Sequence, residues 1–190
     1  GITPDKPETG YGYIGVQDNN LESSVLNVDK FVEKPDVETA TSYLESGNFF
    51  WNSGILIVKA SIWLGAIKAF QIDIYQNVKS AWASSNFDGQ FFRVGIEDFS
   101  RVRAQSIDYA VLELCVAKGL PVKMIPVDIG WSDLGSWDAV HGQLPKDSSD
   151  NAVKGDVVIK NTNDSLIYST HRLTAVTNLN GVMVVETPDA

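Results

Sequence analysis

The order of β-rich and helical segments most constrains how this 190-residue chain can fold. Up to Pro145, short segments rich in β-branched and aromatic residues alternate with helical patterns, which is the order of an α/β domain. Asp18, Asn19 and Asn20 are expected to form the turn between the first two strands. The predicted strands are 11–17, 25–32, 54–58 and 122–126, and the predicted helices are 37–46, 62–70 and 107–118.

Local signals define the ends of these helices. Asp36 is expected to begin the first helix and Gly47 to end it, whereas Ser61 and Ser106 are expected to cap the other two. The buried face of the first helix is expected to contain Val37, Ala40 and Leu44. The strand 54–58 is a continuous apolar run, which is typical of a strand covered on both faces.

The composition changes after Pro145. Residues 146–150 are polar and charged, and the rest of the chain consists of short β-rich segments separated by Asn, Asp or Gly. These segments are 153–159, 165–168, 173–177 and 182–187. We therefore place a boundary near Pro145, between a 1–145 α/β domain and a 146–190 β-rich module.

The two ends of the sequence suggest a piece of a longer polypeptide. The chain begins with Gly1 in a loop that contains prolines, and it ends three residues after the strand pattern 182–187. We therefore expect the β-rich module to be truncated.

Charge and composition exclude several classes of partner. The net charge of −9 repels nucleic acid at long range, so we expect any phosphate to be held by local cations, backbone N–H groups or a metal. No apolar run reaches the ~20 residues of a membrane helix, so no membrane partner is expected. The single cysteine, Cys115, excludes an internal disulfide and favours a reducing compartment, the cytoplasm.

The densest motif is 131–137, Trp-Ser-Asp-Leu-Gly-Ser-Trp. It combines the carboxylate of Asp133 with a glycine, two hydroxyl residues and two indoles. Asp and Ser are also the residues that begin helices, because their oxygens accept the free N–H groups of the first turn. The residues alone leave both a helix cap and a functional site open for Asp133.

A second motif, Glu33-Lys34-Pro35, ends a predicted strand. The residue before proline favours extended backbone, so Lys34 is expected at the mouth of the sheet, where open α/β sheets bind ligands. A carboxylate accepts sugar hydroxyls, and an ammonium neutralises a phosphate. The alternative is a pair of ordinary solvated charges.

Asn52 and Gly12 are two further candidates. The amide of Asn52, in Trp-Asn-Ser-Gly, offers a donor and an acceptor to a vicinal diol, although these residues also suit a simple turn. Gly12 marks either a hairpin position or a place where a sugar lies against bare backbone. By contrast, His141 and His171 lack metal-ligand spacing, and Cys115 is expected to be a packed, inert thiol.

Five motifs in this order resemble one family. They are 7–14, 31–35, 51–54, 106–110 and 131–137. Together they look like the middle and C-terminal part of bacterial mannose-1-phosphate guanylyltransferases, which belong to the sugar-nucleotide pyrophosphorylases. The resemblance implies the C-terminal portion of a Rossmann-like nucleotidyltransferase domain, followed by a small β-rich module.

The resemblance also implies an activity: transfer of a guanylyl group from GTP to mannose 1-phosphate, giving GDP-mannose and pyrophosphate. Gly12, Glu33 and Asn52 match positions that hold the sugar, Lys34 matches the lysine on the sugar phosphate, and Asp133 matches an aspartate that binds Mg²⁺. The family's glycine-rich loop and second metal-binding aspartate have no match here. We therefore expect this piece of chain to be inactive alone.

Two alternatives remain open. The base specificity is inferred from the resemblance only, so thymidylyl or uridylyl transfer to another hexose 1-phosphate is the alternative chemistry. A non-catalytic regulatory or assembly domain on the same scaffold is the alternative class of function. In either case the β-rich module is where we expect a homo-oligomer to form.

Overall fold

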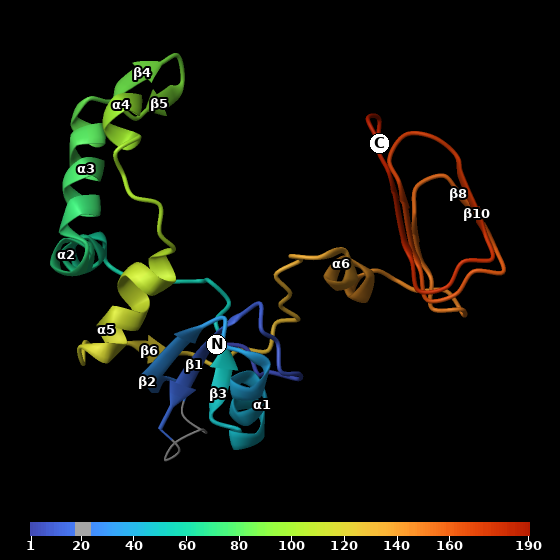
Figure 1. Cartoon of the computed structure of the whole chain (residues 1–190), viewed down its shortest axis with the longest axis horizontal. Coiled ribbons are helices and arrows are strands. Elements are labelled where there is room, and N and C mark those ends of the chain that lie inside the picture. The colour runs from blue at the N-terminus through green and yellow to red at the C-terminus, as the bar shows by residue number, and fades with distance from the viewer. Residues whose placement is uncertain (18–23) are drawn as a thin grey trace. The chain divides into compact units, whose positions relative to one another are not determined.

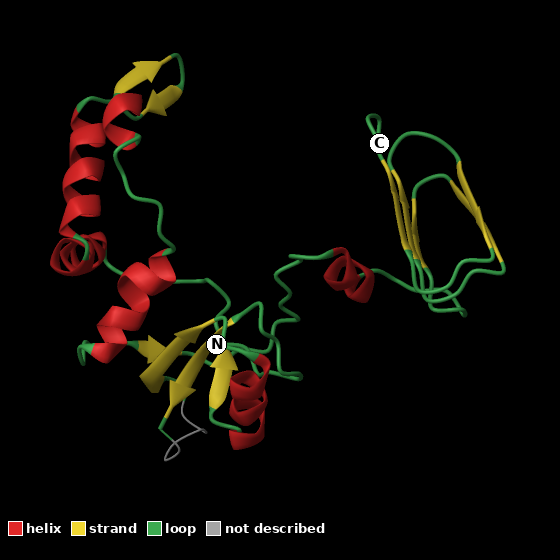
Figure 2. Cartoon of the chain, viewed as in Figure 1, coloured by secondary structure: helices red, strands yellow, loops and turns green. Residues whose placement is uncertain are grey.

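The computed structural model describes residues 1–17 and 24–190, and it has the predicted α/β character (Figures 1 and 2). Its contacts divide the chain into two compact units, Gly1–Trp131 and Ser132–Ala190. The β-rich segments of the second unit begin after the boundary near Pro145, which stays a prediction. The turn expected at 18–20 lies outside the described residues.

A four-stranded antiparallel sheet forms the centre of the first unit, in the order β3-β1-β2-β6 (Figure 1). Its register pairs Gly12 with Glu33 and Tyr13 with Trp51. The candidate residues Gly12 and Glu33 are therefore brought together at one end of the sheet. The strands are β1 (Gly12–Val16), β2 (Leu26–Glu33), β3 (Phe49–Trp51) and β6 (Lys123–Met124).

The side chains of β1 are buried on both faces of this sheet. Tyr13 packs with Trp51 and the helix α1 (Val37–Ser46), whereas Ile14 and Val16 pack in a separate cluster with Met124. Alternate residues of a strand point to opposite faces, so β1 joins two small cores.

The helix α1 (Val37–Ser46) confirms the predicted start and end. Asp36 accepts a hydrogen bond from the backbone N of Thr39 at 2.8 Å, and Gly47 ends the helix with φ +72°. The expected buried face is only partly right, because Leu44 is half-buried. The helix buries Ala40 and Tyr43, while Val37, in its first turn, is exposed.

The segment 54–58 is not the predicted strand. Its residues Ile55, Leu56, Ile57 and Val58 are exposed, Ile57 by 94%. An apolar run indicates only that a segment could be buried. Within the described part of the chain, no strand pairs with residues 54–58.

Most of residues 60–99 form helices and a small hairpin, with α2 and α4 both packed against α3. The helix α2 begins after Lys59 without a side-chain cap, so the cap predicted at Ser61 is wrong. The elements are α2 (Ala60–Phe70), α3 (Ile72–Ala83), β4 (Asn86–Asp88), β5 (Phe91–Arg93) and α4 (Ile96–Phe99).

The helix predicted over 107–118 is divided in two. Asp108–Leu112 is a π-helical turn, here labelled η2, and Glu113–Ala117 is the α-helix α5. Ser106 lies just before the turn, and its hydroxyl accepts a hydrogen bond from Asp108 N at 3.3 Å, as expected of a cap.

The second unit contains the helix α6 (Trp137–Gln143), followed by the predicted β-rich part. Here the chain coils so that β7, β9 and β11 stack in parallel, and β8 stacks on β10 (Figure 1). Parallel stacking of successive turns is the arrangement of a solenoid. These strands are β7 (Ala152–Lys154), β8 (Val157–Lys160), β9 (Leu166–Ser169), β10 (Thr174–Thr177) and β11 (Met183–Glu186). Each described helix of the chain is too short or too polar to cross a bilayer.

Candidate functional site

Four of the five predicted site residues lie together at one end of the sheet. Gly12 is paired with Glu33, and its carbonyl accepts a hydrogen bond from Asn52 N at 2.7 Å. A Cβ on Gly12 would lie 2.4 Å from Glu33 Oε2 and 3.3 Å from the Cβ of Asn52. A side chain at position 12 would therefore have to displace the Glu33 carboxylate, and glycine leaves that space free.

Lys34 is the fourth member, and its backbone differs from the prediction. It lies in the left-handed region with φ +48°, not in the extended conformation expected before proline. Its N–H donates to the carbonyl of Tyr11 at 3.2 Å, which holds the chain as it turns out of β2. Strained backbone of this kind is concentrated at functional sites.

Glu33 and Lys34 form a loose ion pair of unequal exposure. Lys34 Nζ lies 3.8 Å from Glu33 Oε1, and the side chains are 59% and 9% exposed respectively. The carboxylate is thus held inside the site while the ammonium reaches into solvent. Such a pair suits a ligand that carries hydroxyls at one end and an anion at the other.

The amide of Asn52 is held at both ends. Its Nδ2 donates to Asp108 Oδ1 at 3.1 Å, and its Oδ1 accepts from Gly54 N at 3.0 Å. Gly54 has φ +70°, so the turn expected at this motif is present as well. The turn at 52–54 therefore helps to orient the side chain of Asn52.

Sequence reasoning missed three residues that complete this site: Asp108, Tyr109 and Glu113. Tyr109 donates its hydroxyl hydrogen to the carbonyl of Glu33 at 3.3 Å, and Glu113 Oε1 accepts from Glu33 N at 3.1 Å. Asp108 and Tyr109 lie within the motif 106–110 on which the family resemblance rests, but neither of them was given a role in the site. Because these contacts join residues that are far apart in the chain, no local pattern could have revealed them.

The electrostatics of Glu33 follow from this packing. Burial raises the pKa of its carboxyl, the negative charges of Asp108 and then Glu113 raise it further, and the ammonium of Lys34 opposes them. A carboxylate that is costly to ionise is stabilised by hydroxyl donors, so a polyhydroxylated ligand would fit this site.

Asp133 lies in the second unit, so the structure does not place it with the four residues above. Its neighbours are tightly arranged: Leu134 has φ +50°, and a Cβ on Gly135 would lie 2.4 Å from Asp133 Oδ2. The cap of α6 is Ser136, whose hydroxyl accepts from Ala139 N at 3.2 Å. In the structure the helix α6 is therefore capped by Ser136 and not by Asp133.

Asp133 offers one hard oxygen donor group for a metal. Among the described residues there is no group of three His, Cys, Asp or Glu that could hold a metal ion. Mg²⁺ is compatible with a single carboxylate, because it keeps several waters and takes substrate phosphates as its other ligands. The donor chemistry of Asp133 therefore fits Mg²⁺ bound together with phosphates.

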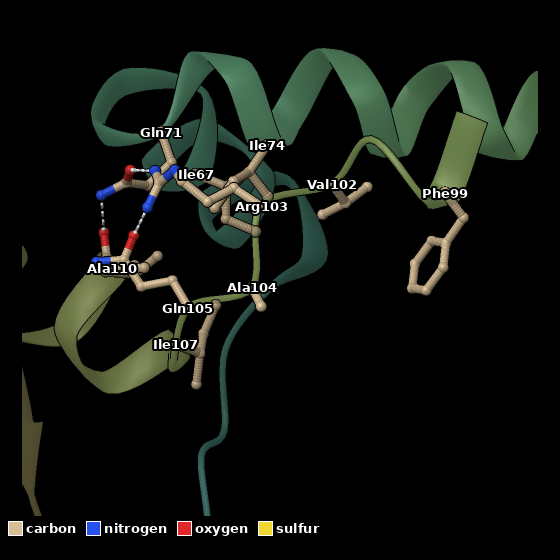
Figure 3. A pocket seen from close by; sticks show the side chains of 11 residues that line it. Ile67, Gln71, Ile74, Phe99, Val102, Arg103, Ala104, Gln105, Ile107 and Ala110 are labelled. Carbon is tan, nitrogen blue, oxygen red and sulfur yellow. Dashed lines mark hydrogen bonds between the residues drawn. The ribbon is translucent and has the colours of Figure 1, made fainter. Parts of the chain in front are cut away.

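The other candidates, Cys115 and His171, have surroundings of their own. Cys115 is buried among apolar side chains, and burial raises the pKa of its thiol. His171 pairs with Glu186 in the solenoid. A cavity of about 310 Å³ lies beside α2, α3 and the segment 99–111, and it contains none of the predicted site residues (Figure 3).

Comparison with known proteins agrees with the resemblance of the motifs. Residues 1–149 match the family model described as nucleotidyl transferase. The chain is 39% identical over 196 residues to the mannose-1-phosphate guanylyltransferase 2 of Escherichia coli O157:H7. It is also 39% identical over 190 residues to the xanthan biosynthesis protein XanB of Xanthomonas campestris. All of this chain is covered in both cases, but only 40% and 39% of the relatives' own lengths.

A solved structure shows the same fold. The mannose-1-phosphate geranyltransferase from Thermus thermophilus matches all of this chain and 53% of its own, with a TM-score of 0.81 at 24% identity. This likeness concerns the fold, whereas the family model also matches the sequence over most of the chain. The chain therefore belongs to the nucleotidyl transferase family.

Proposed function

We propose that the complete protein transfers a guanylyl group from GTP to mannose 1-phosphate, giving GDP-mannose and pyrophosphate. The observation that carries this proposal is the cluster of Gly12, Glu33, Lys34 and Asn52, which combines a buried carboxylate, an oriented amide and a solvent-facing ammonium. The relative named mannose-1-phosphate guanylyltransferase 2 supports the choice of sugar and base.

In this proposal each residue binds one part of the sugar phosphate. Glu33 and Asn52 take sugar hydroxyls, bare backbone at Gly12 lets the ring approach, and Lys34 contacts the phosphate. A phosphate oxygen then attacks the α-phosphorus of GTP in line, and pyrophosphate leaves. Both reactants are anionic, so positioning and the cancellation of charge dominate the barrier. Lys34 contributes by reducing the charge repulsion as the two phosphates approach.

Asp133 would hold the metal. Mg²⁺, when bound, neutralises phosphate charge and aligns the reacting groups. The carboxylate of Asp133 is the donor that this chain contributes, and its Oδ2 occupies the space that a side chain on Gly135 would need.

The setting of the reaction follows from its reactants. GDP-mannose is an activated sugar, and the relative named for xanthan biosynthesis supports a role in polysaccharide assembly. GTP-dependent synthesis and a buried, reduced Cys115 are consistent with the cytoplasm. The solenoid of the second unit is the surface through which we expect a homo-oligomer to assemble.

Pyrophosphate release by the complete protein tests this function. We expect release from GTP with mannose 1-phosphate and Mg²⁺, and strongly reduced release in Lys34→Ala. Faster turnover with UTP or dTTP and another hexose 1-phosphate would replace guanylyl by uridylyl or thymidylyl transfer. Absence of release with every pair would favour a non-catalytic domain.

A further inference from the structure

The π-helical turn Asp108–Leu112 interrupts what would otherwise be one α-helix. Its defining bond runs from Glu113 N to the carbonyl of Asp108, five residues back. In an α-helix, side chains five positions apart point about 140° away from each other. The wider turn brings Asp108 and Glu113 closer to one side of the helix, and π-helical turns of this kind are frequent at functional sites.

Both residues of that side contact the sugar site. Asp108 Oδ1 accepts from the amide of Asn52, and Glu113 Oε1 accepts from the backbone of Glu33. Tyr109, which follows Asp108, donates its hydroxyl hydrogen to the carbonyl of Glu33. Residues 108–113 thus hold the backbone of Glu33 and the side chain of Asn52.

The orientation of the Asn52 amide follows from its partners. An ionised Asp108 can only accept, so the amide must present its NH₂ group there. The N–H of Gly54 can only donate, so the amide must present its oxygen on the other side. The amide retains a second hydrogen and a second lone pair, which are one donor and one acceptor for adjacent hydroxyls.

Hydrogen bonds from other side chains also stabilise the π-helical turn. Gln71, at the junction of α2 and α3, donates from Nε2 to the carbonyl of Ala110 at 3.0 Å (Figure 3). Arg103 Nη2 in turn donates to Gln71 Oε1 at 2.7 Å, which orients that amide. Ser106 completes the arrangement, because its hydroxyl donates to Asp108 Oδ2 at 3.0 Å.

We propose that Asp108 is a positioning residue that fixes the amide of Asn52 for the sugar hydroxyls, and that the π-helical turn places it there. This inference rests on the proposed function of the same site. It assigns Asp108 no contact with substrate: its effect passes through Asn52.

A double-mutant cycle in the complete protein tests this route. We expect Asp108→Ala to lower kcat/KM for mannose 1-phosphate about tenfold, mainly through KM, and Asn52→Ala to lower it at least as much. Because Asp108 acts through Asn52, the double variant should be no worse than Asn52→Ala alone. Asp88→Asn, which removes an exposed carboxylate paired with Arg93, is the charge-matched control and should leave kcat/KM unchanged.

The results separate this inference from the proposed function. If the wild type turns over and Asp108→Ala matches it, or if the two losses multiply, Asp108 does not act through Asn52. Asp108→Asn keeps one acceptor and should recover part of the loss, which guards against a variant that merely folds poorly.

A readout without substrate covers the case in which the wild type does not turn over, which would sink the proposed function. The side-chain NH₂ resonances of Asn52 in the ¹⁵N-labelled protein should move in Asp108→Ala and stay in place in Asp88→Asn. Unmoved resonances in Asp108→Ala would overturn the inference by themselves.

Discussion

The carboxylate of Glu33 occupies the space that a side chain on Gly12 would need, with 2.4 Å between Oε2 and an ideal Cβ. The two residues are cross-strand partners in β1 and β2. Because Gly12 has no side chain, the Glu33 carboxylate can lie against the backbone of Gly12, and a ring-shaped ligand can contact both residues. Gly12 thus leaves space for the side chain of its cross-strand partner.

We expect Gly12→Ala to impair function more than stability. The new methyl group would push aside the end of a flexible side chain, so the thermal midpoint should change little, while the displaced Glu33 should raise KM for the sugar phosphate about tenfold or more. The matched control is Gly65→Ala in α2, where a Cβ meets no atom within 4 Å. Equal KM values in both variants would remove Gly12 from the site.

Lys34 combines an exposed charge with an unfavourable backbone conformation. Lys34→Ala should lose a charge-assisted contact of about 1.5–3 kcal/mol, or about tenfold to a hundredfold in kcat/KM. Lys34→Gly should lose the same activity but raise stability by about 1 kcal/mol, because glycine adopts φ +48° without strain. Lys34→Arg should rescue in part only. Unchanged kinetics in Lys34→Ala would mean that Lys34 is an ordinary solvated surface charge.

Glu33 should oppose stability in the absence of ligand. Its pKa is raised by burial and by Asp108, so the folded state binds a proton more tightly than the unfolded chain does. The free energy of unfolding therefore falls as pH rises above the ordinary value of 4.5. Glu33→Gln should unfold at an equal or higher temperature at pH 7, and lose this advantage below pH 4.5. A lower midpoint at pH 7, measured calorimetrically, would contradict this expectation.

Two substitutions in the 131–137 motif separate capping from metal binding. Ser136→Ala should cost about 1 kcal/mol, because it removes the cap of α6, and leave the Mg²⁺ dependence of turnover unaltered. Asp133→Asn should abolish turnover with metal-free stability almost unchanged, since it removes an anionic ligand and keeps the shape. Thermal midpoints without metal and turnover against Mg²⁺ concentration measure both. Normal Mg²⁺ dependence in Asp133→Asn would exclude the metal role.

Protonation of Glu186 in acid should destabilise the solenoid. Partial burial alone would raise the pKa of this carboxyl, but hydrogen bonds from His171, Ser169 and Arg172 outweigh it and lower the pKa to about 2. The stabilisation is complete above 4.5, the ordinary pKa, and is lost as pH falls toward about 2. Glu186→Gln should lower the unfolding temperature at pH 7 and make it less pH-dependent in that range. The exposed Glu45→Gln serves as control, and parallel pH profiles for the two variants would refute the assignment.

The sequence was sufficient wherever the cause of a structure is local. Asp36 and Gly47 define α1 because a cap oxygen and a left-handed glycine act on backbone within a few residues. The antiparallel pair of β1 and β2 and the β-rich part likewise follow short patterns, and four of the candidate site residues lie at one end of the sheet that contains this pair. Spacing alone predicted neither the exposure of 54–58 nor the buried face of α1, because burial depends on what else packs there.

Tertiary structure alone decided the environment of the candidate site. Asp108, Tyr109 and Glu113 reach Glu33 and Asn52 from a distant part of the chain. Such contacts depend on a helical segment packing against β2, and they have no counterpart in the spacing of nearby residues. The left-handed backbone of Lys34 has the same origin. A hydrogen bond to Tyr11, formed only once the strands have paired, accompanies a conformation that the residue before a proline does not favour by itself.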